Sequence, residues 1–330
     1  MGGNTLRVAV LAYDGCMGAE VFGIADTLLI ANRISALRRP AEPPPFACSI
    51  VAASRTQVTL AGGAVLQPAP RAPADLLVVP AFDFSSAREI DVIVARLGPE
   101  IAMIRTAAGR HAVASICGGA FLLAEAGLLD GRRATTAWAM AEIFMRRYPA
   151  TRLDPRAMLI NDGDITTSGA FTAYADLALA IIHDQAGAEI ARAVARFSLV
   201  GTARTSQAPF IDRNLTRRPD PFEREVERWL AVHLAERYRL DRAAAAFGMS
   251  ARTFLRRVRE VTGQSPLELL QQVRLDQARR WLESTDLAIA EIAARVGYRD
   301  VPSFHRLFRR ETAMTPAAYR RAFRQQGGID

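Results

Sequence analysis

The chain of 330 residues contains no lysine, so all 42 of its basic residues are arginine. Arginine enrichment is therefore partly compositional, and a single arginine says little about binding. Only three cysteines (Cys16, Cys48 and Cys117) and four histidines occur, and they lack the spacing of a disulfide framework or a zinc site. The sequence accordingly gives no support for a bound metal or cofactor.

Long apolar runs are also lacking. No run of about 18 apolar residues is present to form a membrane-spanning helix. Residues 1–7 have neither the apolar core of a secretory signal nor a Ser or Thr at position 6 for myristoylation. We therefore expect a cytoplasmic protein with no membrane partner.

An internal repeat near the C-terminus is the most informative feature that is present. Residues 246–257 are answered 50 residues later by residues 296–310. Each copy contains a short apolar helix, a turn glycine and a second, amphipathic helix. This pattern predicts two helix-turn-helix units, and a duplicated reading helix implies double-stranded DNA as the partner. The matching positions are Phe254, Arg256, Val258, Thr262 and Pro266 in the first copy and Phe304, Arg306, Phe308, Thr312 and Pro316 in the second.

The second helix of each copy has an apolar face and a largely basic face. Ser250 is placed to cap the first of these helices, and Phe254 and Val258 form its buried stripe, as Phe304 and Phe308 do in the second. A helix over residues 266–283 would hold the two units at a fixed spacing, and reading helices about 34 Å apart would enter successive major grooves. The residues expected to contact DNA are Arg252, Leu255, Arg256, Arg257, Arg259, Ser303, His305, Arg306, Arg309 and Arg310. For His305, a solvated surface position is an open alternative.

The charge distribution agrees with this interpretation. Residues 217–330 contain 22 arginines and 15 acidic residues, a net charge of +7, whereas residues 1–216 have 20 arginines, 19 acidic residues and a net charge of +1. A basic surface gains affinity for DNA by releasing counterions from phosphates, and arginine can also bind guanine in bidentate fashion.

The last 110 or so residues resemble the AraC-type DNA-binding domain. The resemblance lies in residues 248–257, 262–266, 274–286, 291–298 and 315–320. It implies that Arg252, Leu255 and Arg256 face bases in the first unit and that Pro302, Ser303 and Arg306 do so in the second. Leu255 and Pro302 depart from the polar residues often found there, so base readout at these positions must be apolar contact or absent.

The upstream region alternates apolar strands and helices. Short apolar runs at residues 6–12, 46–52, 75–80 and 111–116, with helical stretches such as residues 19–32 between them, predict an α/β fold with a flavodoxin-like parallel sheet sandwiched by helices. We place this domain at residues 1–211, a linker containing Arg217 and Arg218 at residues 212–221, and the all-α domain with two helix-turn-helix units at residues 222–330.

Cys117 is the chemically suggestive residue upstream. A strand that turns through Gly118 and Gly119 into a helix would place the cysteine at a helix N-terminus, where amides and the macrodipole favour the thiolate. Glu20, near the end of the neighbouring strand, is a candidate carboxylic partner. No histidine follows Cys117 to act as a base.

This region resembles the class I glutamine amidotransferase-like fold, in the PfpI-like branch that is fused to AraC-type domains in GlxA-family regulators. Residues 117–138 and 164–176 carry the resemblance. Catalytic relatives pair the cysteine with a histidine directly after it, and many fused regulators have a histidine before the tryptophan. This chain has Gly118 and Ala137 there, which counts against catalysis. The resemblance places a ligand crevice at Glu20, Phe82, Cys117, Gly118, Trp138, Ser168 and Gly169.

Two functions remain open for the N-terminal domain. We favour a ligand sensor over an enzyme: a small-molecule effector, by resemblance an amino-acid-derived or quaternary-amine metabolite, would shift the DNA-binding domains of a homodimer. The alternative is a cysteine-dependent hydrolase or hydratase with Glu20 as acid and base and an oxyanion hole at Gly118 and Gly119. Cys117 could also be only a small residue that fits a tight turn. The expected partners are DNA, the effector, a second copy of the chain and, as a further candidate, RNA polymerase.

Overall fold

The computed structural model describes residues 4–84, 86–201, 204–212, 215 and 219–324. The chain divides into two compact units, Met1–Gln207 and Ala208–Asp330, each described here by itself. The first unit therefore ends before residue 211, the predicted end of the N-terminal domain. Arg217 and Arg218 of the predicted linker lie outside the described residues. Within the described part of the chain, no helix has both the length and the apolar character needed to cross a membrane.

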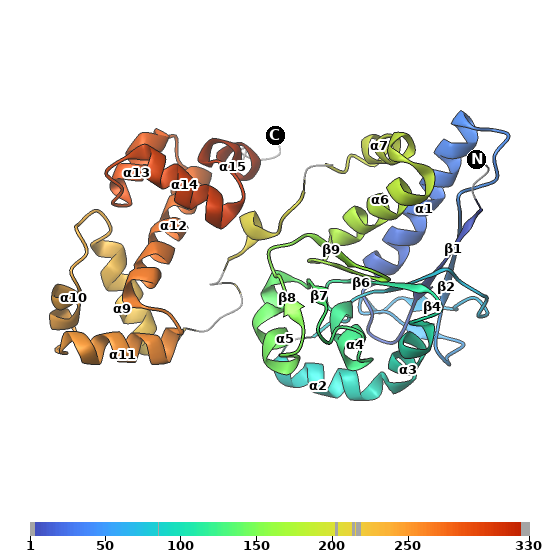
Figure 1. Cartoon of the computed structure of the whole chain (residues 1–330), viewed down its shortest axis with the longest axis horizontal. Helices are drawn as coiled ribbons and strands as arrows, with labels where there is room; N and C mark the ends of the chain where they lie inside the picture. Colours follow the sequence, from blue (N-terminus) through green and yellow to red (C-terminus); the bar gives the residue numbers. More distant parts are fainter. Residues whose placement is uncertain (1–3, 85, 202–203, 213–214, 216–218, 325–330) are drawn as a thin grey trace. The chain divides into compact units, whose positions relative to one another are not determined.

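A six-stranded sheet forms the centre of the N-terminal unit (Figure 1). Neighbouring strands are parallel except for the last pair, which is antiparallel. All four residues of the central strand β5 are buried, as expected for a strand covered on both faces. In spatial order the strands are β2 (Phe46–Val51), β1 (Leu6–Leu11), β5 (Leu76–Val79), β6 (Ala112–Ile116), β10 (Ile165–Ser168) and β9 (Leu159–Asp162). Two small sheets pair β3 (Val58–Thr59) with β4 (Val65–Leu66) and β7 (Arg133–Ala134) with β8 (Arg152–Leu153).

Helices cover both faces of this sheet (Figure 1). One layer contains α1 (Gly18–Arg38), α6 (Ala173–Ala186) and α7 (Ala188–Phe197), which pack against one another. The opposite layer contains α2 (Ala87–Arg96), α3 (Gly98–Ala107), α4 (Gly119–Glu125) and α5 (Ala141–Arg147). The predicted α/β fold is confirmed, and the four predicted strands are present with ends that differ by at most one residue.

The hairpin formed by β9 and β10 was not predicted from the sequence. Its two strands are four residues each and are joined by Gly163 and Asp164. A glycine followed by an aspartate between two strands is typical of a two-residue hairpin turn, and Gly163 has the required positive φ of 74°, so the pair Gly163-Asp164 could have revealed it.

The C-terminal unit consists of helices arranged around α12 (Pro266–Ser284) (Figure 1). One hydrophobic cluster takes residues of α12 up to Val273, and a second begins at Leu275. Each cluster contains the apolar face of one predicted reading helix, so α12 joins two helix-turn-helix units, as predicted. The other elements are η2 (Ala208–Phe210), α9 (Pro221–Val232), α10 (Leu240–Ala246), α11 (Ala251–Thr262), α13 (Ile289–Arg295), α14 (Val301–Thr312) and α15 (Pro316–Phe323).

Candidate nucleic-acid interface and sensor site

The two predicted reading helices are α11 and α14, and both begin at a side-chain cap. The Ser250 Oγ accepts a hydrogen bond from the Thr253 amide at 3.2 Å, and an Asp300 carboxylate oxygen accepts one from the Ser303 amide at 2.8 Å. Such caps satisfy amides that the helix itself leaves unpaired and so fix where each helix starts. Phe254 and Phe308 are fully buried on the inner faces. The predicted Ser250 cap and the predicted apolar stripes are therefore confirmed, whereas the Asp300 cap was not predicted.

On α11 the basic side chains are exposed but differ in their surroundings. Arg252 and Arg259 are exposed, and Leu255 is 41% exposed between them. Arg256 forms an ion pair with Glu260 at 3.5 Å, within the same helix. The Arg257 guanidinium lies over the ring of Phe222 on α9, at 4.2 Å from the ring centre. Arg257 thus has a structural contact that its place in the sequence did not reveal.

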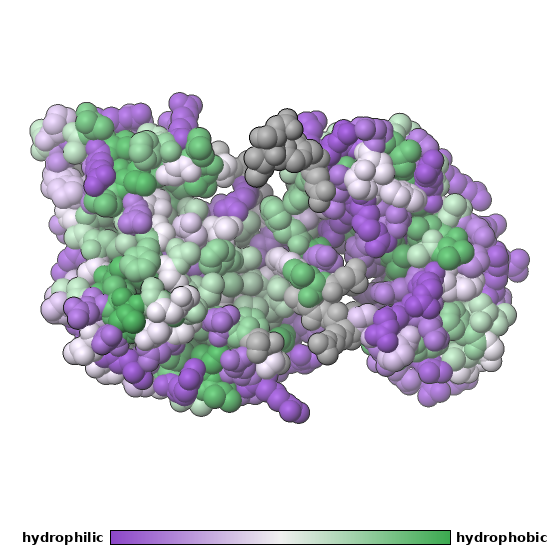
Figure 2. All heavy atoms as spheres, turned by 180° about the vertical axis from the view of Figure 1, so that it is seen from behind, coloured by the Kyte–Doolittle hydropathy of each residue, from purple (hydrophilic) through white to green (hydrophobic). Residues whose placement is uncertain are grey.

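On α14 the predicted contact residues also fall into different classes. Arg306, Arg309 and Arg310 are exposed, and Arg310 forms an ion pair with Glu311 at 2.8 Å. His305 is half-buried, and its Nε2 is enclosed without a hydrogen-bond partner among the described residues. Contact with DNA through this Nε2 would require the ring to rotate. Figure 2 shows that hydrophilic residues cover much of the visible face of this unit.

Contacts at Arg274 set the spacing of the two helix-turn-helix units. This residue lies on α12 where the two hydrophobic clusters meet, and its Nη2 donates a hydrogen bond to the Leu234 carbonyl at 2.8 Å. Its guanidinium also lies 5.6 Å from the ring centre of Tyr298. A Cβ at Gly297 would be 2.1 Å from the Leu234 oxygen, so the turn of the second unit touches the backbone of the first. The two reading helices are therefore held by direct contact as well as by α12.

In the N-terminal unit, Cys117 occupies the predicted sharp turn between β6 and α4. Its φ of 51° is a left-handed conformation that is unusual for a residue other than glycine. The Cys117 amide donates a hydrogen bond to the Ser168 carbonyl at 3.1 Å, and its carbonyl accepts one from the Thr136 hydroxyl at 2.8 Å. These two bonds hold the turn in place.

Glu20 is fully buried near this turn. One carboxylate oxygen accepts a hydrogen bond from the Ala81 amide at 2.6 Å, and the other has no partner among the described residues. Burial raises the pKa of Glu20 to about 8, so the carboxyl group is largely neutral at physiological pH.

The expectation of a stabilised Cys117 thiolate is wrong. Desolvation, and to a smaller extent the Glu20 carboxylate, raise the pKa of the Cys117 thiol to about 12, although its side chain keeps partial solvent exposure. The Gly118 amide opposes this rise but does not offset it. The loss of hydration therefore raises the thiol pKa by more than the N-terminus of the seven-residue helix α4 lowers it. A neutral thiol beside a neutral carboxylic acid is a weak arrangement for nucleophilic catalysis.

Other predicted crevice residues lie at the end of β10, shortly after β5 and in a short helix. Ser168 is fully buried at the end of β10, and its hydroxyl donates a hydrogen bond to the Ser115 carbonyl at 3.0 Å. Phe82 is also buried, and its ring meets that of Phe121 on α4 edge to face at 6.3 Å. Trp138 is half-buried in the short helix η1 (Trp138–Met140).

Gln207 is a residue of this site that the sequence analysis missed. Its side chain is 1% exposed and fills the space beside Gly169, where an added Cβ would lie 2.4 Å from the Gln207 amide carbon. Its Oε1 accepts hydrogen bonds from the amides of Ala170 at 2.9 Å and Trp138 at 3.2 Å. A lone polar residue far along the chain gave no local signal of this role.

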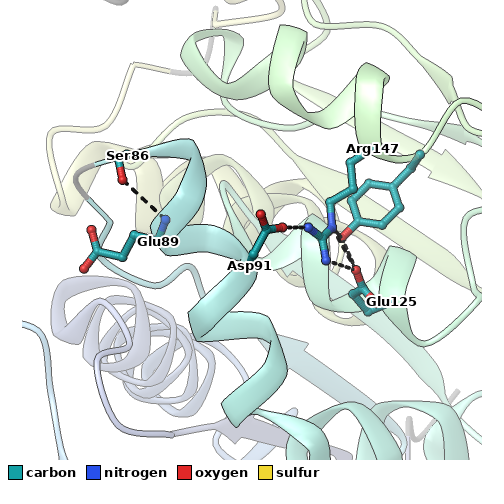
Figure 3. A network of polar contacts seen from close by, with 6 residues as sticks. Ser86, Glu89, Asp91, Glu125 and Arg147 are labelled. Carbon is teal, nitrogen blue, oxygen red and sulfur yellow. Dashed lines mark hydrogen bonds and ion pairs between the residues drawn. The ribbon is translucent and has the colours of Figure 1, made fainter.

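Polar contacts around Arg147 brace the helix that follows the Cys117 turn (Figure 3). Its guanidinium bonds one carboxylate oxygen of Glu125, at the end of α4, at 2.8 and 2.9 Å, and also pairs with Asp91 on α2. The Tyr148 hydroxyl donates to the same Glu125 oxygen at 2.6 Å. Three helices of one layer are thereby tied together.

Other possible sites lie elsewhere or lack ligands. A hollow of about 370 Å³ is lined by Asp176, His183, Arg192 and Arg204, and the predicted crevice residues are not part of its lining. In the part of the chain that the structure describes, no three His, Cys, Asp or Glu side chains gather closely enough to hold a metal ion.

Comparison with known proteins finds matches in both units. Residues 233–322 match the helix-turn-helix domain family, and residues 101–184 match the DJ-1/PfpI family. The chain is 33% identical over 222 residues to the HTH-type transcriptional regulator GlxA of Rhizobium meliloti, covering 63% of this chain and 65% of GlxA. It is 30% identical over 210 residues to the HTH-type transcriptional regulator CdhR of Pseudomonas aeruginosa, covering 60% of each chain.

A ThiJ/PfpI family protein from Pseudomonas syringae has a similar solved structure, with 20% identity and a TM-score of 0.49 over 60% of this chain and 76% of that one. The chain spans less than two thirds of the length of these two curated relatives. Both relatives are named as regulators rather than enzymes. The chain therefore carries an AraC-type helix-turn-helix domain and a DJ-1/PfpI domain, and the curated proteins that it resembles are named HTH-type transcriptional regulators.

Proposed function

We propose that the protein is a sequence-specific, DNA-binding transcriptional regulator whose N-terminal unit senses a small metabolite. The main support is the pair of capped reading helices, α11 and α14, held at a fixed spacing by α12 and by the contacts at Arg274. Two exposed basic faces on one rigid support suit successive major grooves of one duplex. The likeness to GlxA and CdhR, both named HTH-type transcriptional regulators, points the same way.

The DNA contacts divide into two kinds in this proposal. Arg252, Arg256 and Arg306 read base edges, and the remaining arginines of the two helices mostly hold phosphates. Leu255, with 41% of its surface exposed, is suited to apolar contact with a thymine methyl. Ser303 faces the bases beside Arg306. His305 contacts a phosphate or a base through Nε2 after its ring rotates.

The sensor crevice of the proposal lies around the Cys117 turn and includes Glu20, Phe82, Gly118, Trp138, Ser168 and Gly169. The buried Glu20 carboxyl group has one oxygen without a partner among the described residues, and glycine rather than histidine follows Cys117, which together favour binding over catalysis. The ligand is a small polar metabolite.

The regulator acts as a homodimer in the cytoplasm, with RNA polymerase as a further partner. Phe22 and Leu29 support self-association, because both are large, exposed apolar residues seven positions apart on α1. A chain carrying Leu29→Arg should then have half the solution mass of the wild type in light scattering. An unchanged mass would place the dimer contact elsewhere or show that the protein is a monomer.

Fluorescence anisotropy tests the DNA-binding function directly. The purified protein is titrated with a labelled duplex from upstream of its own gene, with a scrambled duplex as the control at one fixed salt concentration. A preference of about 10³-fold or more for the upstream duplex is the expected result. Equal affinities for every upstream fragment and the scrambled control would contradict sequence-specific binding.

A further inference from the structure

The Gln207 side chain is held from several sides in the N-terminal unit. Besides accepting the two hydrogen bonds from Trp138 and Ala170, it donates through Nε2 to the carbonyls of Thr136 at 2.8 Å, Ala157 at 3.0 Å and Pro155 at 3.1 Å. An amide nitrogen carries only two hydrogens, so these acceptors share them. Small displacements of the surrounding loops must therefore redistribute the Gln207 hydrogen bonds.

These partners belong to the loops of the candidate sensor crevice. Trp138 is a predicted crevice residue, and Ala170 directly follows another, Gly169. Thr136 connects Gln207 to the Cys117 turn, because its carbonyl accepts from Gln207 while its hydroxyl donates to the Cys117 carbonyl at 2.8 Å. A ligand that moves either loop thus acts on Gln207 through one or two hydrogen bonds.

The residues that follow Gln207 are anchored in the C-terminal unit by Arg279 of α12. Its Nη1 donates to the Ile211 carbonyl at 2.6 Å and its Nη2 to the Ala208 carbonyl at 3.2 Å. Arg279 is 9% exposed, so this pair of bonds is largely shielded from water. Phe210 lies between these two residues in the sequence, and its ring meets that of Phe323 edge to face, with ring centres 5.1 Å apart.

We infer that residues 207–211 are the segment that couples the sensor crevice to the DNA-binding helices, with Gln207 and Arg279 as its two positioning residues. The inference rests on the proposed function. Gln207 and Ala208 are consecutive, so no free residue separates the anchor in one unit from the anchor in the other. Arg279 lies on the helix that carries both helix-turn-helix units. The Gln207 anchor in one unit and the Ala208 anchor in the other are thus joined by a single peptide bond.

Thermodynamic reciprocity gives a test that needs no ligand. If the crevice affects DNA binding, then DNA binding must affect the crevice by the same coupling free energy. The full-length protein is labelled with 5-fluorotryptophan, and the Trp138 fluorine resonance is assigned with Trp138→Phe. A duplex of about 20 base pairs, enough for two successive major grooves, is then added. Anisotropy of the same duplex reports binding separately.

The wild-type Trp138 resonance should shift on DNA binding, and Gln207→Glu should abolish the shift while keeping DNA affinity, because a carboxylate cannot donate to the three carbonyls. Gln185→Glu adds the same charge in the same unit and should keep the shift, because the Gln185 side chain bonds the exposed Asn4 carbonyl and is not one of the partners of Gln207. Arg279→Gln should also lose the Trp138 shift. Arg280→Gln, a change at the neighbouring, exposed residue, should keep it.

Normal DNA binding without a Trp138 shift in the wild type would overturn the coupling role, as would an undiminished shift in Gln207→Glu. If Gln185→Glu also lost the Trp138 shift, the added negative charge alone would explain the loss in Gln207→Glu, and the coupling role would be overturned. If thermal melting shows that Gln207→Glu does not fold, the comparison of Arg279→Gln with Arg280→Gln tests the coupling role instead. The same Trp138 shift in both variants would overturn it. Absence of DNA binding in anisotropy would instead refute the proposed function, and the coupling role with it.

Discussion

Arg306 Nη2 donates a hydrogen bond to the Ser303 Oγ at 2.7 Å, one turn earlier on α14. The equivalent arginine of the first unit, Arg256, is instead paired with Glu260, one turn later on α11. Base-edge contacts of reading helices lie toward their N-terminal ends. In the proposed complex Arg306 would therefore already be held toward the bases, whereas Arg256 would have to leave Glu260 before reaching them.

This difference gives Arg306 the leading role in specificity. Arg306→Ala should weaken binding to the cognate duplex by about 1–3 kcal/mol and relax the preference at one base pair. Arg309→Ala, the matched control on the same helix, should lower affinity evenly across sequences, because a phosphate contact carries no base information. Anisotropy against cognate and single-substituted duplexes measures both. Equal losses on cognate and scrambled DNA for Arg306→Ala would refute this division of roles.

The contact at Gly297 predicts a difference between the two turn glycines. Gly297 and Gly248 both have positive φ, of 86° and 64°, but only an alanine at position 297 would collide with neighbouring backbone. Gly248→Ala should cost about 1–2 kcal/mol from the left-handed conformation alone. Gly297→Ala should cost clearly more and weaken DNA binding by disturbing the spacing of the two units. Urea unfolding followed by tryptophan fluorescence compares them, and equal losses would show that the Leu234 contact is unimportant.

Glu20 should make the stability of the N-terminal unit depend on pH. Burial raises its folded-state pKa from 4.5 to about 8, so the folded protein holds a proton that the unfolded chain releases between these values. The free energy of unfolding should fall as pH rises from about 5 to 8, by up to about 1.4 kcal/mol per pH unit.

Glu20→Gln keeps a neutral side chain of the same shape and should flatten this dependence. Glu142→Gln, at an exposed ion pair with Arg146, should leave the slope unchanged. Urea unfolding at pH 5.5 and pH 8 provides the comparison. A wild-type slope that persists in Glu20→Gln would assign the titration to another group.

Cys117 should react slowly with alkylating reagents. A thiol pKa of about 12 instead of 9.0 leaves about 10³-fold less thiolate at pH 8. Mass spectrometry of the Cys117 peptide after timed iodoacetamide treatment measures the rate, and the same peptide from urea-unfolded protein is the control. Native labelling as fast as the control would contradict the raised pKa, and labelling faster than the control would show an activated thiolate and revive the hydrolase alternative.

The features that could be predicted from the sequence are those encoded locally. The reading helices follow from caps and apolar residues at helical spacing, such as Ser250, Phe254 and Val258, and the sheet follows from short apolar runs such as β5. The apolar residues within 266–283 also predicted correctly that one long helix joins the two helix-turn-helix units.

The features that could not be predicted depend on contacts between distant residues. Gln207 reaches partners about 40 to 70 positions away, and no periodicity marks it. An arginine on a reading helix, such as Arg257, is typical of a phosphate contact. Its position over the Phe222 ring depends on where α9 packs, which the local sequence does not reveal. The Cys117 thiol was misjudged because its turn is local, while the burial that raises its pKa comes from the surrounding fold.

Hydroxyl-radical footprinting on the duplex selected by anisotropy tests the central claim most directly. Two reading helices fixed on α12 should protect two segments about 10 base pairs apart on one face of the DNA for each bound chain. Arg306→Ala should weaken protection of one segment more than the other. A single protected segment, or even protection without the helical repeat, would contradict the claim that α11 and α14 read successive major grooves as one rigid pair.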